Sequence, residues 1–503
     1  MDIYSLWTVV IWYAKANLTE KKVSMQMTKK YIIGIDGGSQ SSKVVIFDLE
    51  GTIVSEGKCD LQPMHLAENG VVEHPDDDLW DSLIVASKAA MDNFPGNKAD
   101  IIGLGLCTIR FCRALLKKDG SLASPVMSWM DARVSKPYVH EDADVAYVTT
   151  TSGYVTQRLT GEFVDTAANY QGQWPIDTDT WAWSEDETVI QQFGIPREML
   201  FELQMPGSIL GQVTKEAAHA MGIPEGIPVV ATANDKAVEA LGAGLLAENT
   251  ALISLGTYIA AMIPGHDNPK GTTAFWTNFA STPHQYLYES NGIRRGMWTV
   301  SWFKELLGDD IMLKAHQDGH SVEEYLNREA QQVPAGSDGL MTVLDWLAPD
   351  DAPYRKGMMI GFDARHTRAH MYRSILEAIA LTMKNRVEEM SAELGITLDK
   401  IIISGGGSNS ALLMQIFADV FGIPAMRNEV NGSASIGAAI CVAVALGVYP
   451  SYEVAVKKMA RIRDQFEVQE GNRVLYRRIN QEVYRDITKS TDSILKKAAT
   501  IFL

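Results

Sequence analysis

The sequence feature that most constrains the fold is a Gly-rich turn that lies between two strands instead of opening a helix. Residues 31–48 read YIIGIDGGSQSSKVVIFD, in which an apolar strand breaks at Asp36 and an alternating, β-branched run begins at Lys43. P-loops and dinucleotide fingerprints need their glycine turn to start a helix, whereas the second run here is typical of a strand. The sequence therefore predicts a β-hairpin.

The turn of this hairpin has the residue types of a phosphate cradle. Gly37 and Gly38 allow the backbone to approach an anion closely, and Ser39 and Ser41 add hydroxyl donors. Asp36 is placed to hold a hydrated divalent cation. Turns of Gly, Asn and Asp also reverse a chain without binding anything, so a polar hairpin tip with a surface Asp is the alternative.

The same pattern returns in the second half of the chain. Residues 250–263, TALISLGTYIAAMI, give an apolar strand, a tight turn at Gly256 and Thr257, and a second apolar strand. The 218 residues from Gly38 to Gly256 are far too many for a solenoid or propeller repeat. We therefore expect a duplicated α/β architecture, with two halves that face each other across a cleft.

Length and composition agree with a two-domain enzyme. The chain has 503 residues, more than one hydrophobic core usually serves, with 46% hydrophobic and 21% charged residues. Its formal net charge of −17 disfavours nucleic acid as a partner, because phosphate backbones require a basic face. The four cysteines are spaced neither like a disulfide framework nor like zinc ligands. They suit a reducing, cytoplasmic location.

The N-terminal segment is apolar from Tyr4 to Tyr13 but too short to cross a membrane. Ten helical residues span about 15 Å, half of the roughly 30 Å of a membrane core. A signal peptide would carry positive charge before the apolar run, where this chain has only Asp2. We expect no membrane partner, and we interpret residues 1–29 as a disordered extension or the product of an upstream start codon. Export is the alternative.

In the first half, the segment between Val229 and Gly244 has the residue pattern that most clearly indicates catalysis. An apolar strand leads to Asp235 and Lys236 and then into a helix of small residues. A carboxylate at this position can take the proton from a substrate hydroxyl while that oxygen attacks a phosphoryl group, which contributes about 10² to 10⁴ in rate. The alternative is an Asp that serves only as the N-cap of the helix.

In the second half, three consecutive glycines, Gly405, Gly406 and Gly407, follow the apolar run that begins at Ile401. A flat adenine or ribose can lie against such bare backbone, and a merely flexible loop is the alternative. A structural helix is expected upstream, with Glu377 and Lys384 facing solvent.

Another structural helix is expected after His74. Pro75 would occupy its first helical position. Trp80 belongs to its apolar stripe and should be buried.

Taken together, these motifs resemble the FGGY carbohydrate kinases, the group that contains xylulokinase, glycerol kinase, gluconokinase and ribulokinase. The chain looks most similar to uncharacterised bacterial members described only as FGGY-family sugar kinases. The resemblance extends from Lys30 to the end of the chain. It is carried by IDGGSQSSK (35–43), SWMDAR (128–133), ANDKAVEALGAG (233–244), SLGTY (254–258) and SGGGSNS (404–410).

The resemblance implies two actin-like (ribonuclease H-like) ATPase domains facing a central cleft: an N-terminal sugar-binding and phosphate domain over residues 30–247 and a C-terminal nucleotide-binding domain over 248–503. It implies an ATP-dependent sugar kinase that transfers the γ-phosphate to a hydroxyl of a small ketose, polyol or sugar acid. ATP and Mg²⁺ are the expected cofactors, and the sugar and ATP the expected partners, with a homodimer as one candidate assembly. A catalytically silent sugar-sensing or scaffold protein on the same fold is the rival.

The resemblance also implies roles for individual residues. Asp235 would be the catalytic base and Asp36 would orient the magnesium ion. The residues expected to bind ATP are Gly38, Ser39, Gln40, Gly256, Thr257, Gly405, Gly406, Gly407 and Asn409. Those expected to contact the substrate are Arg110, Trp129 and Lys236.

The identity of the sugar depends on the basic residues near the expected cleft. Arg110 falls where glycerol kinases place a hydroxyl-binding Arg, and Arg113 and Lys236 are further candidates. If at least two of the three reach the sugar, bidentate Arg geometry would favour a sugar acid over a neutral polyol. Arginines that extend to solvent are the alternative.

Overall fold

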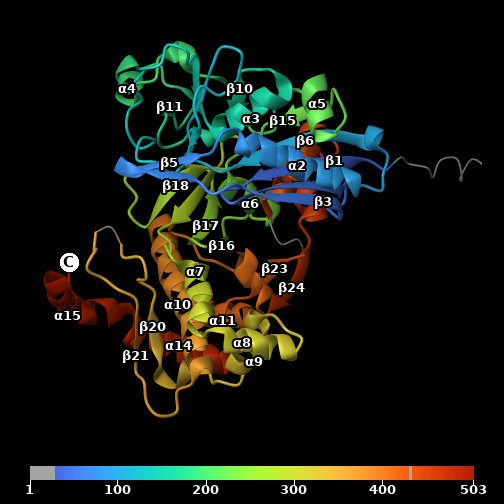
Figure 1. The fold of residues 1–503 in the computed structure, drawn as a ribbon. Helices are drawn as coiled ribbons and strands as arrows, with labels where there is room; N and C mark the ends of the chain where they lie inside the picture. The colour runs from blue at the N-terminus through green and yellow to red at the C-terminus, as the bar shows by residue number, and fades with distance from the viewer. Residues whose placement is uncertain (1–28, 350, 430–432, 503) are drawn as a thin grey trace, which may run out of the picture.

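The computed structural model describes residues 29–349, 351–429 and 433–502, and it contains two large mixed sheets with helices on their faces (Figure 1). The N-terminal sheet lies above the C-terminal one in the view of Figure 1. The extension predicted for residues 1–29 falls outside the described residues except for Lys29.

The N-terminal sheet has six strands in the order β14-β15-β6-β1-β2-β3. The predicted hairpin is confirmed, because β1 and β2 pair antiparallel around the Gly-Ser-Gln turn. The six strands are β1 (Tyr31–Gly37), β2 (Ser41–Asp48), β3 (Ile53–Asp60), β6 (Ile101–Thr108), β14 (Ile209–Gln212) and β15 (Pro228–Val230).

The C-terminal sheet has seven strands in the order β18-β19-β17-β16-β22-β23-β24. The second predicted hairpin is confirmed as the antiparallel pair of β16 and β17. The seven strands are β16 (Thr250–Leu255), β17 (Ile259–Gly265), β18 (Phe275–Phe279), β19 (Tyr286–Ser290), β22 (Lys400–Ser404), β23 (Ala425–Asn428) and β24 (Ile462–Phe466).

The two sheets repeat one topology. Strand β1 pairs antiparallel with β2 and parallel with β6, which pairs parallel with β15. Strand β16 pairs antiparallel with β17 and parallel with β22, which pairs parallel with β23. The outer strands β14 and β24 are each antiparallel to their neighbour. This confirms the predicted duplication, and in each sheet the parallel strands end at a common edge.

Helices and short strands complete the two halves (Figure 1). The helices are α2 (Asp78–Asp92), α3 (Thr151–Thr160), α4 (Glu187–Phe193), α5 (Lys215–Met221), α6 (Asp235–Gly242), α7 (Gly296–Leu306), α8 (Asp309–Gln317), α9 (Val322–Gln331), α10 (Arg368–Leu394), α11 (Ala411–Phe421), α12 (Ser433–Ala445), α13 (Tyr452–Met459), α14 (Glu470–Glu482) and α15 (Ile487–Phe502). The short strands are β4 (His65–Ala67), β5 (Val71–His74), β7 (Ala114–Leu116), β8 (Val126–Met127), β9 (Tyr147–Thr149), β10 (Val164–Thr166), β11 (Ile176–Asp177), β12 (Ala182–Trp183), β13 (Glu202–Gln204), β20 (Met341–Val343) and β21 (Met358–Ile360).

The two halves are joined where helices α6 and α12 pack against each other. A Cβ atom on Gly437 would lie 2.0 Å from the carbonyl oxygen of Val238, and one on Gly242 would lie 1.9 Å from that of Ser433. Helix α12 also lies against β1, where a Cβ on Gly34 would meet the carbonyl oxygen of Ser435 at 2.0 Å. Glycine is therefore required here by the close approach of backbones.

The helix after His74 starts later than predicted. Helix α2 begins at Asp78 with Asp77 at its N-cap position, so Pro75 precedes the helix instead of occupying its first turn. Asp76 has a φ of 44°, which turns the chain between Pro75 and the helix. The prediction for Trp80 is confirmed, since its residue is only 6% exposed.

The prediction that Glu377 faces solvent is wrong. Its carboxylate is buried and accepts hydrogen bonds from Arg373 Nε at 2.8 Å, the Tyr476 hydroxyl at 2.7 Å and Ser337 Oγ at 2.8 Å. A buried charge is tolerated when it is paired and fully hydrogen-bonded, as here. Lys384 remains partly exposed and pairs with Glu388 at 3.0 Å.

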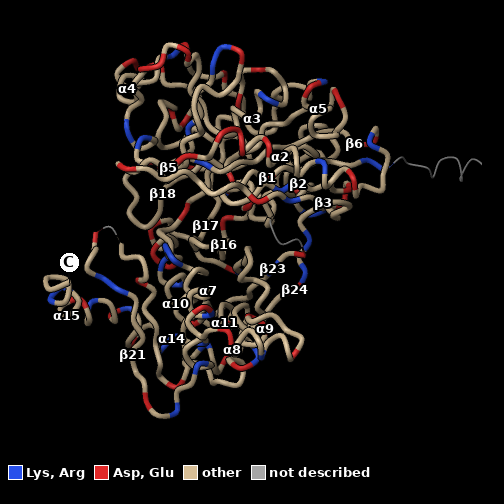
Figure 2. Tube along the Cα trace, in the orientation of Figure 1, with Lys and Arg blue, Asp and Glu red and all other residues tan. Residues whose placement is uncertain are grey.

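Charged residues of both signs are interspersed along both halves in the orientation of Figure 2, in keeping with the acidic composition. Within the described part of the chain, no helix combines the length and the apolar character needed to cross a membrane.

Candidate active site

Three neighbouring parallel strands of the N-terminal sheet, β15, β6 and β1, deliver polar side chains to one edge. Asp36 is the penultimate residue of β1 and pairs with Cys107 of β6. Arg110 follows β6 by two residues, and Asp235 begins the helix that follows β15. The strand order therefore gathers three residues that are far apart in the sequence.

Asp235 is not the N-cap of helix α6. That position belongs to Asn234, whose side-chain oxygen accepts a hydrogen bond from the backbone N–H of Ala237 at 3.1 Å. Asp235 Oδ1 is buried and accepts no hydrogen bond from any residue that the structure describes, and Arg110 Nε lies 3.8 Å from it. Burial raises the pKa of Asp235, while Arg110 and Lys236 oppose the increase. The N-cap alternative therefore does not hold.

Asp36 lies in the same group of acids. Burial raises its pKa to about 7, with the neighbouring charges of Asp235 and Glu239 adding to the effect and those of Lys43 and Lys236 opposing it. No cluster of three or more His, Cys, Asp or Glu side chains suited to a metal ion occurs in the described ranges. A cation here would rely on Asp36, water and ligand oxygens, which is the way Mg²⁺ is commonly held.

Lys236 and Glu239 connect helix α6 to the C-terminal sheet. Lys236 Nζ donates to Glu239 Oε2 and to Ser254 Oγ, both at 2.9 Å. Ser404 Oγ donates to Glu239 Oε1 at 2.5 Å. Ser254 and Ser404 are paired residues of β16 and β22, so this network lies directly before the two glycine turns of the C-terminal half.

Those two turns lie against each other. Gly405 has φ 84° and ψ 174°, a conformation that only glycine adopts readily, and a Cβ on it would lie 2.6 Å from the carbonyl oxygen of Leu255. The turn at Gly256 and Thr257 begins at the next residue. Gly406 is exposed and a Cβ there would meet nothing within 4 Å. The backbone at this edge is therefore open to a ligand.

The turn of the N-terminal hairpin is also accessible. The N–H of Gly38 donates to the carbonyl oxygen of Ser41 at 3.1 Å, which closes the turn. Ser39 is partly exposed and Gln40 is exposed. The hydroxyl and the amide are thus available at the tip of the hairpin.

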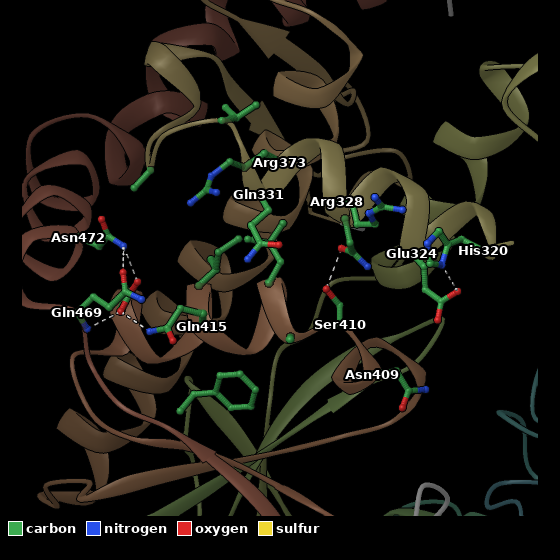
Figure 3. Close-up of a pocket in the computed structure, with 18 residues that line it drawn as sticks. His320, Glu324, Arg328, Gln331, Arg373, Asn409, Ser410, Gln415, Gln469 and Asn472 are labelled. Carbon is green, nitrogen blue, oxygen red and sulfur yellow. Dashed lines mark hydrogen bonds and ion pairs between the residues drawn. The ribbon is translucent and has the colours of Figure 1, made fainter. Parts of the chain in front are cut away.

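A cavity of about 680 Å³ opens beside the glycine turn of the C-terminal half, bounded by α9, α10, α11 and α14 (Figure 3). Asn409 and Ser410 line the end near the turn, and Gln469 and Asn472 line the other end. Its volume is within the range of small-molecule pockets. Asn409 therefore lies between the turn and a cavity of suitable size.

Arg110 reaches across to the C-terminal half. Its guanidinium donates to both carboxylate oxygens of Glu289 on β19, each at 2.8 Å. The guanidinium carbon also lies 4.9 Å from the ring centre of Trp276 and 5.1 Å from that of Phe111. Arg110 is thus held by a bidentate ion pair and two aromatic rings.

Of the other two predicted cations, Arg113 does not join Arg110, whereas Lys236 acts together with Arg110 on Asp235. Arg113 is buried and donates to the backbone carbonyls of residues 133, 134 and 136, so the expectation of an unusually cationic pocket is wrong for Arg113, which also does not extend to solvent. Lys236 is paired with Glu239. Trp129 follows β8 and is half exposed, and its contact with a sugar stays a prediction.

Sequence reasoning missed the partners Glu239, Glu289 and Trp276. Two of them had a signal. Glu239 lies among small residues of a helix, and Glu289 ends the otherwise apolar run Tyr-Leu-Tyr of β19. A charged residue in such surroundings must find a partner when it is buried.

The duplicated sheets joined through α6 and α12, with glycine turns at their ends, define an actin-like ATPase fold. Residues 31–141 and 135–242 match the N-terminal domain of the FGGY family of carbohydrate kinases, and residues 251–446 match its C-terminal domain. The chain therefore belongs to the FGGY family and is a carbohydrate kinase, a class of enzyme that uses ATP, which confirms the resemblance.

Comparisons with individual proteins agree with this family assignment. The chain is 56% identical over 472 residues to the uncharacterised sugar kinase YgcE of Escherichia coli (strain K12), covering 94% of this chain and 96% of that one. It is 26% identical over 479 residues to the glycerol kinase of Bordetella parapertussis, covering 84% and 90%. The crystal structure of xylulose kinase from Rhodospirillum rubrum has the same fold, with a TM-score of 0.79, 21% identity and coverage of 93% and 100%.

Proposed function

We propose that this enzyme transfers the γ-phosphate of ATP to a hydroxyl of a small carbohydrate, with Asp235 as general base. The observation that carries the proposal is the state of the Asp235 carboxylate. Asn234 is the cap of the helix, so Asp235 is not needed for capping. Asp235 Oδ1 accepts no hydrogen bond from the described residues, and it lies 3.8 Å from Arg110 Nε. An acceptor hydroxyl placed there would supply the missing donor and lose its proton as it attacks.

ATP would lie along the facing turns. Gly38, Ser39 and Gln40 would hold phosphate oxygens from one side, and Gly256 and Thr257 from the other. The adenosine would rest on the third glycine turn, where the bare backbone and the adjacent cavity support this placement. The residues assigned to it are Gly405, Gly406, Gly407 and Asn409.

Asp36 fits a magnesium ion. Its pKa near 7 reflects a buried carboxyl surrounded by other acids, and a divalent cation would relieve that repulsion and displace its proton. Bound there, Mg²⁺ would neutralise charge on the transferred phosphoryl group. The protein's own contribution is positioning: Asp235 would receive the hydroxyl proton, Lys236 donates to Ser254 two residues before the turn at Gly256, and closure of the halves would exclude water.

The test is carbohydrate-dependent ATP consumption by the full chain. ADP release would be followed in the presence of Mg²⁺ across C3 to C7 polyols, ketoses, aldoses and sugar acids, and the phosphorylated product identified by ³¹P NMR. We expect at least one carbohydrate to stimulate ADP release far above the rate without sugar. Nucleotide binding in a thermal-shift assay with no turnover of any compound would favour the silent sensor or scaffold instead.

Two further properties stay predictions. A homodimer would be tested by light scattering on the purified protein, and a cytoplasmic location by fractionation of the source cells.

A further inference from the structure

We propose that Glu289 is a specificity-determining residue: its ion pair with Arg110 commits the site to neutral polyhydroxylated substrates and rejects those that carry a carboxylate. The inference rests on the proposed function, because it concerns the acceptor that would lie beside Asp235. It reverses the earlier expectation of a sugar acid.

The first step is the use of the Arg110 fork. Both terminal nitrogens donate to Glu289, one to each oxygen, in the bidentate geometry that a substrate carboxylate would otherwise occupy. The Nε edge of the guanidinium faces Asp235 instead. A sugar carboxylate could gain the fork of Arg110 only by displacing Glu289.

The second step is the cost of that displacement. The side chain of Glu289 is 2% exposed and that of Arg110 is 15% exposed. A carboxylate buried to this degree is stable only while it is paired. Removing its partner would leave a buried carboxylate without its hydrogen-bonded counter-ion, so binding of a sugar acid would destabilise the site.

The third step is the rigidity of the pair. The guanidinium lies over the rings of both Trp276 and Phe111, whose centres are 6.2 Å from each other. Phe111 has a φ of 66°, which is a strained conformation for a bulky residue and is typical of a functional site. Arg110 is therefore not free to swing away from Glu289 toward a second anion.

The fourth step is the charge around Asp235. Two cations act on it, together with two further carboxylates. With Asp36, Asp235 and the Lys43 that acts on Asp36 included, the acids outnumber the bases by four to three, and the group consists of Asp36, Asp235, Glu239, Glu289, Arg110, Lys236 and Lys43. A neutral hydroxyl suits this environment, because it can donate to a carboxylate and accept from an arginine, whereas a carboxylate can only accept.

The experiment compares matched substrates that differ at one terminal carbon, which is uncharged in the polyol or aldose and a carboxylate in the acid. Polyols and aldoses of four to six carbons would be paired with the aldonic acids of the same stereochemistry, and kcat/KM measured for each on the full chain. We expect the best neutral compound to exceed the best acid by at least tenfold. We expect Glu289→Gln to lower kcat/KM for the neutral compound and to reduce the neutral-to-acid ratio about tenfold, because the two terminal nitrogens of Arg110 then lack their carboxylate partner.

Glu239→Gln is the matched control. It removes the same charge from the same group, but its partners are Lys236, Ser254 and Ser404 instead of Arg110. The neutral-to-acid ratio should not change in this variant. If Glu289→Gln fails to fold, Glu289→Asp keeps the charge and should retain the preference for neutral compounds.

The outcomes separate the inference from the proposed function. Faster turnover of an acid than of every neutral compound by the wild-type enzyme would overturn the inference and leave the kinase intact. An equal loss on both classes in Glu289→Gln would also overturn it, since a purely structural role predicts that result. Turnover of neither class would overturn the proposed function, and the inference with it.

Discussion

The two sheets share one strand order, yet their equivalent ends carry opposite kinds of chemistry. In the N-terminal half the ends of β1, β6 and β15 lead to Asp36, Arg110 and Asp235. In the C-terminal half the ends of β16 and β22 lead to Gly256 and Gly405. At these strand ends the N-terminal half adds ionisable side chains to its glycine turn, whereas the C-terminal half presents bare backbone.

This difference suggests how a duplicated fold divides one reaction. Charged side chains are suited to handling a proton and a metal ion, because their pKa values respond to burial and to each other. Bare backbone is suited to a large flat ligand, which side chains would exclude. The comparison predicts that substitutions of the ionisable residues at the strand ends of the first half impair chemistry, while those of the glycines at the strand ends of the second impair nucleotide binding.

The largest expected effect is that of Asp235→Asn in the N-terminal half. Loss of the general base should lower kcat by about 10² to 10⁴, while the Kd for nucleotide should change little, because the proposed adenosine contacts lie in the other half. Steady-state kinetics and calorimetric titration with a non-hydrolysable ATP analogue would measure the two quantities. A kcat within threefold of wild type would contradict the assigned role.

A substitution at the junction of the halves tests whether their equivalent helices must touch. Gly437→Ala should destabilise the protein by about 1 to 3 kcal/mol through overpacking, since its Cβ would lie 2.0 Å from the carbonyl oxygen of Val238. Urea unfolding would measure the change. Gly471→Ala is the matched control in helix α14, where a Cβ would meet nothing within 4 Å, and it should be neutral or stabilising. Equal stability of both variants would contradict tight packing at the junction.

In the C-terminal half, Gly405→Ala should raise the KM for ATP by roughly tenfold or more. The positive φ of Gly405 and its contact with Leu255 make a Cβ costly, at about 1 to 3 kcal/mol. Gly406→Ala, one residue on, has open space and should leave the melting temperature unchanged. If Gly405→Ala altered the KM for sugar and left that for ATP unchanged, the proposed division between the halves would fail.

The local features of this site could be predicted from sequence, and the pairing of its charges could not. Both hairpins and the glycine turn are visible in short stretches of sequence, because strand alternation and turn residues act over a few positions. Asp235 was found in the same way, at a junction of strand and helix. These elements therefore follow from sequence patterns without knowledge of the tertiary fold.

The missed features depend on residues distant in the chain. Arg110 and Glu289 are 179 positions apart, and Glu239 and Ser404 are 165 apart. Glu377 was expected on the solvent side because helical periodicity does not reveal that Tyr476 of α14 covers its face. A buried ion pair needs a partner whose position only the tertiary fold supplies. Asp235 can therefore be selected from the sequence as a candidate base, but the neighbouring charges that shift its pKa cannot.

The smallest expected effect concerns Lys236, which lies on helix α6 of the N-terminal half but contacts the C-terminal half. Its Nζ donates to Ser254, two residues before Gly256, and to Glu239. Through Ser254, the Lys236 cation is held two residues before the turn at Gly256 that is proposed to bind phosphate. We therefore expect Lys236 to serve the phosphates of ATP in preference to the sugar.

Lys236→Met should accordingly raise the KM for ATP about tenfold, the value of one charge-assisted hydrogen bond, and change the KM for sugar by less. Because the single variant leaves the buried Glu239 without its ion-pair partner, the double variant Lys236→Met/Glu239→Gln should recover thermal stability without recovering the KM for ATP. Lys43→Met is the matched control. It also removes a cation that acts on Asp36, yet Lys43 pairs with Glu56 on the neighbouring strand. A larger change in the KM for sugar than in that for ATP would assign Lys236 to the acceptor site. The proposed division of roles between the two halves would then be wrong for this residue.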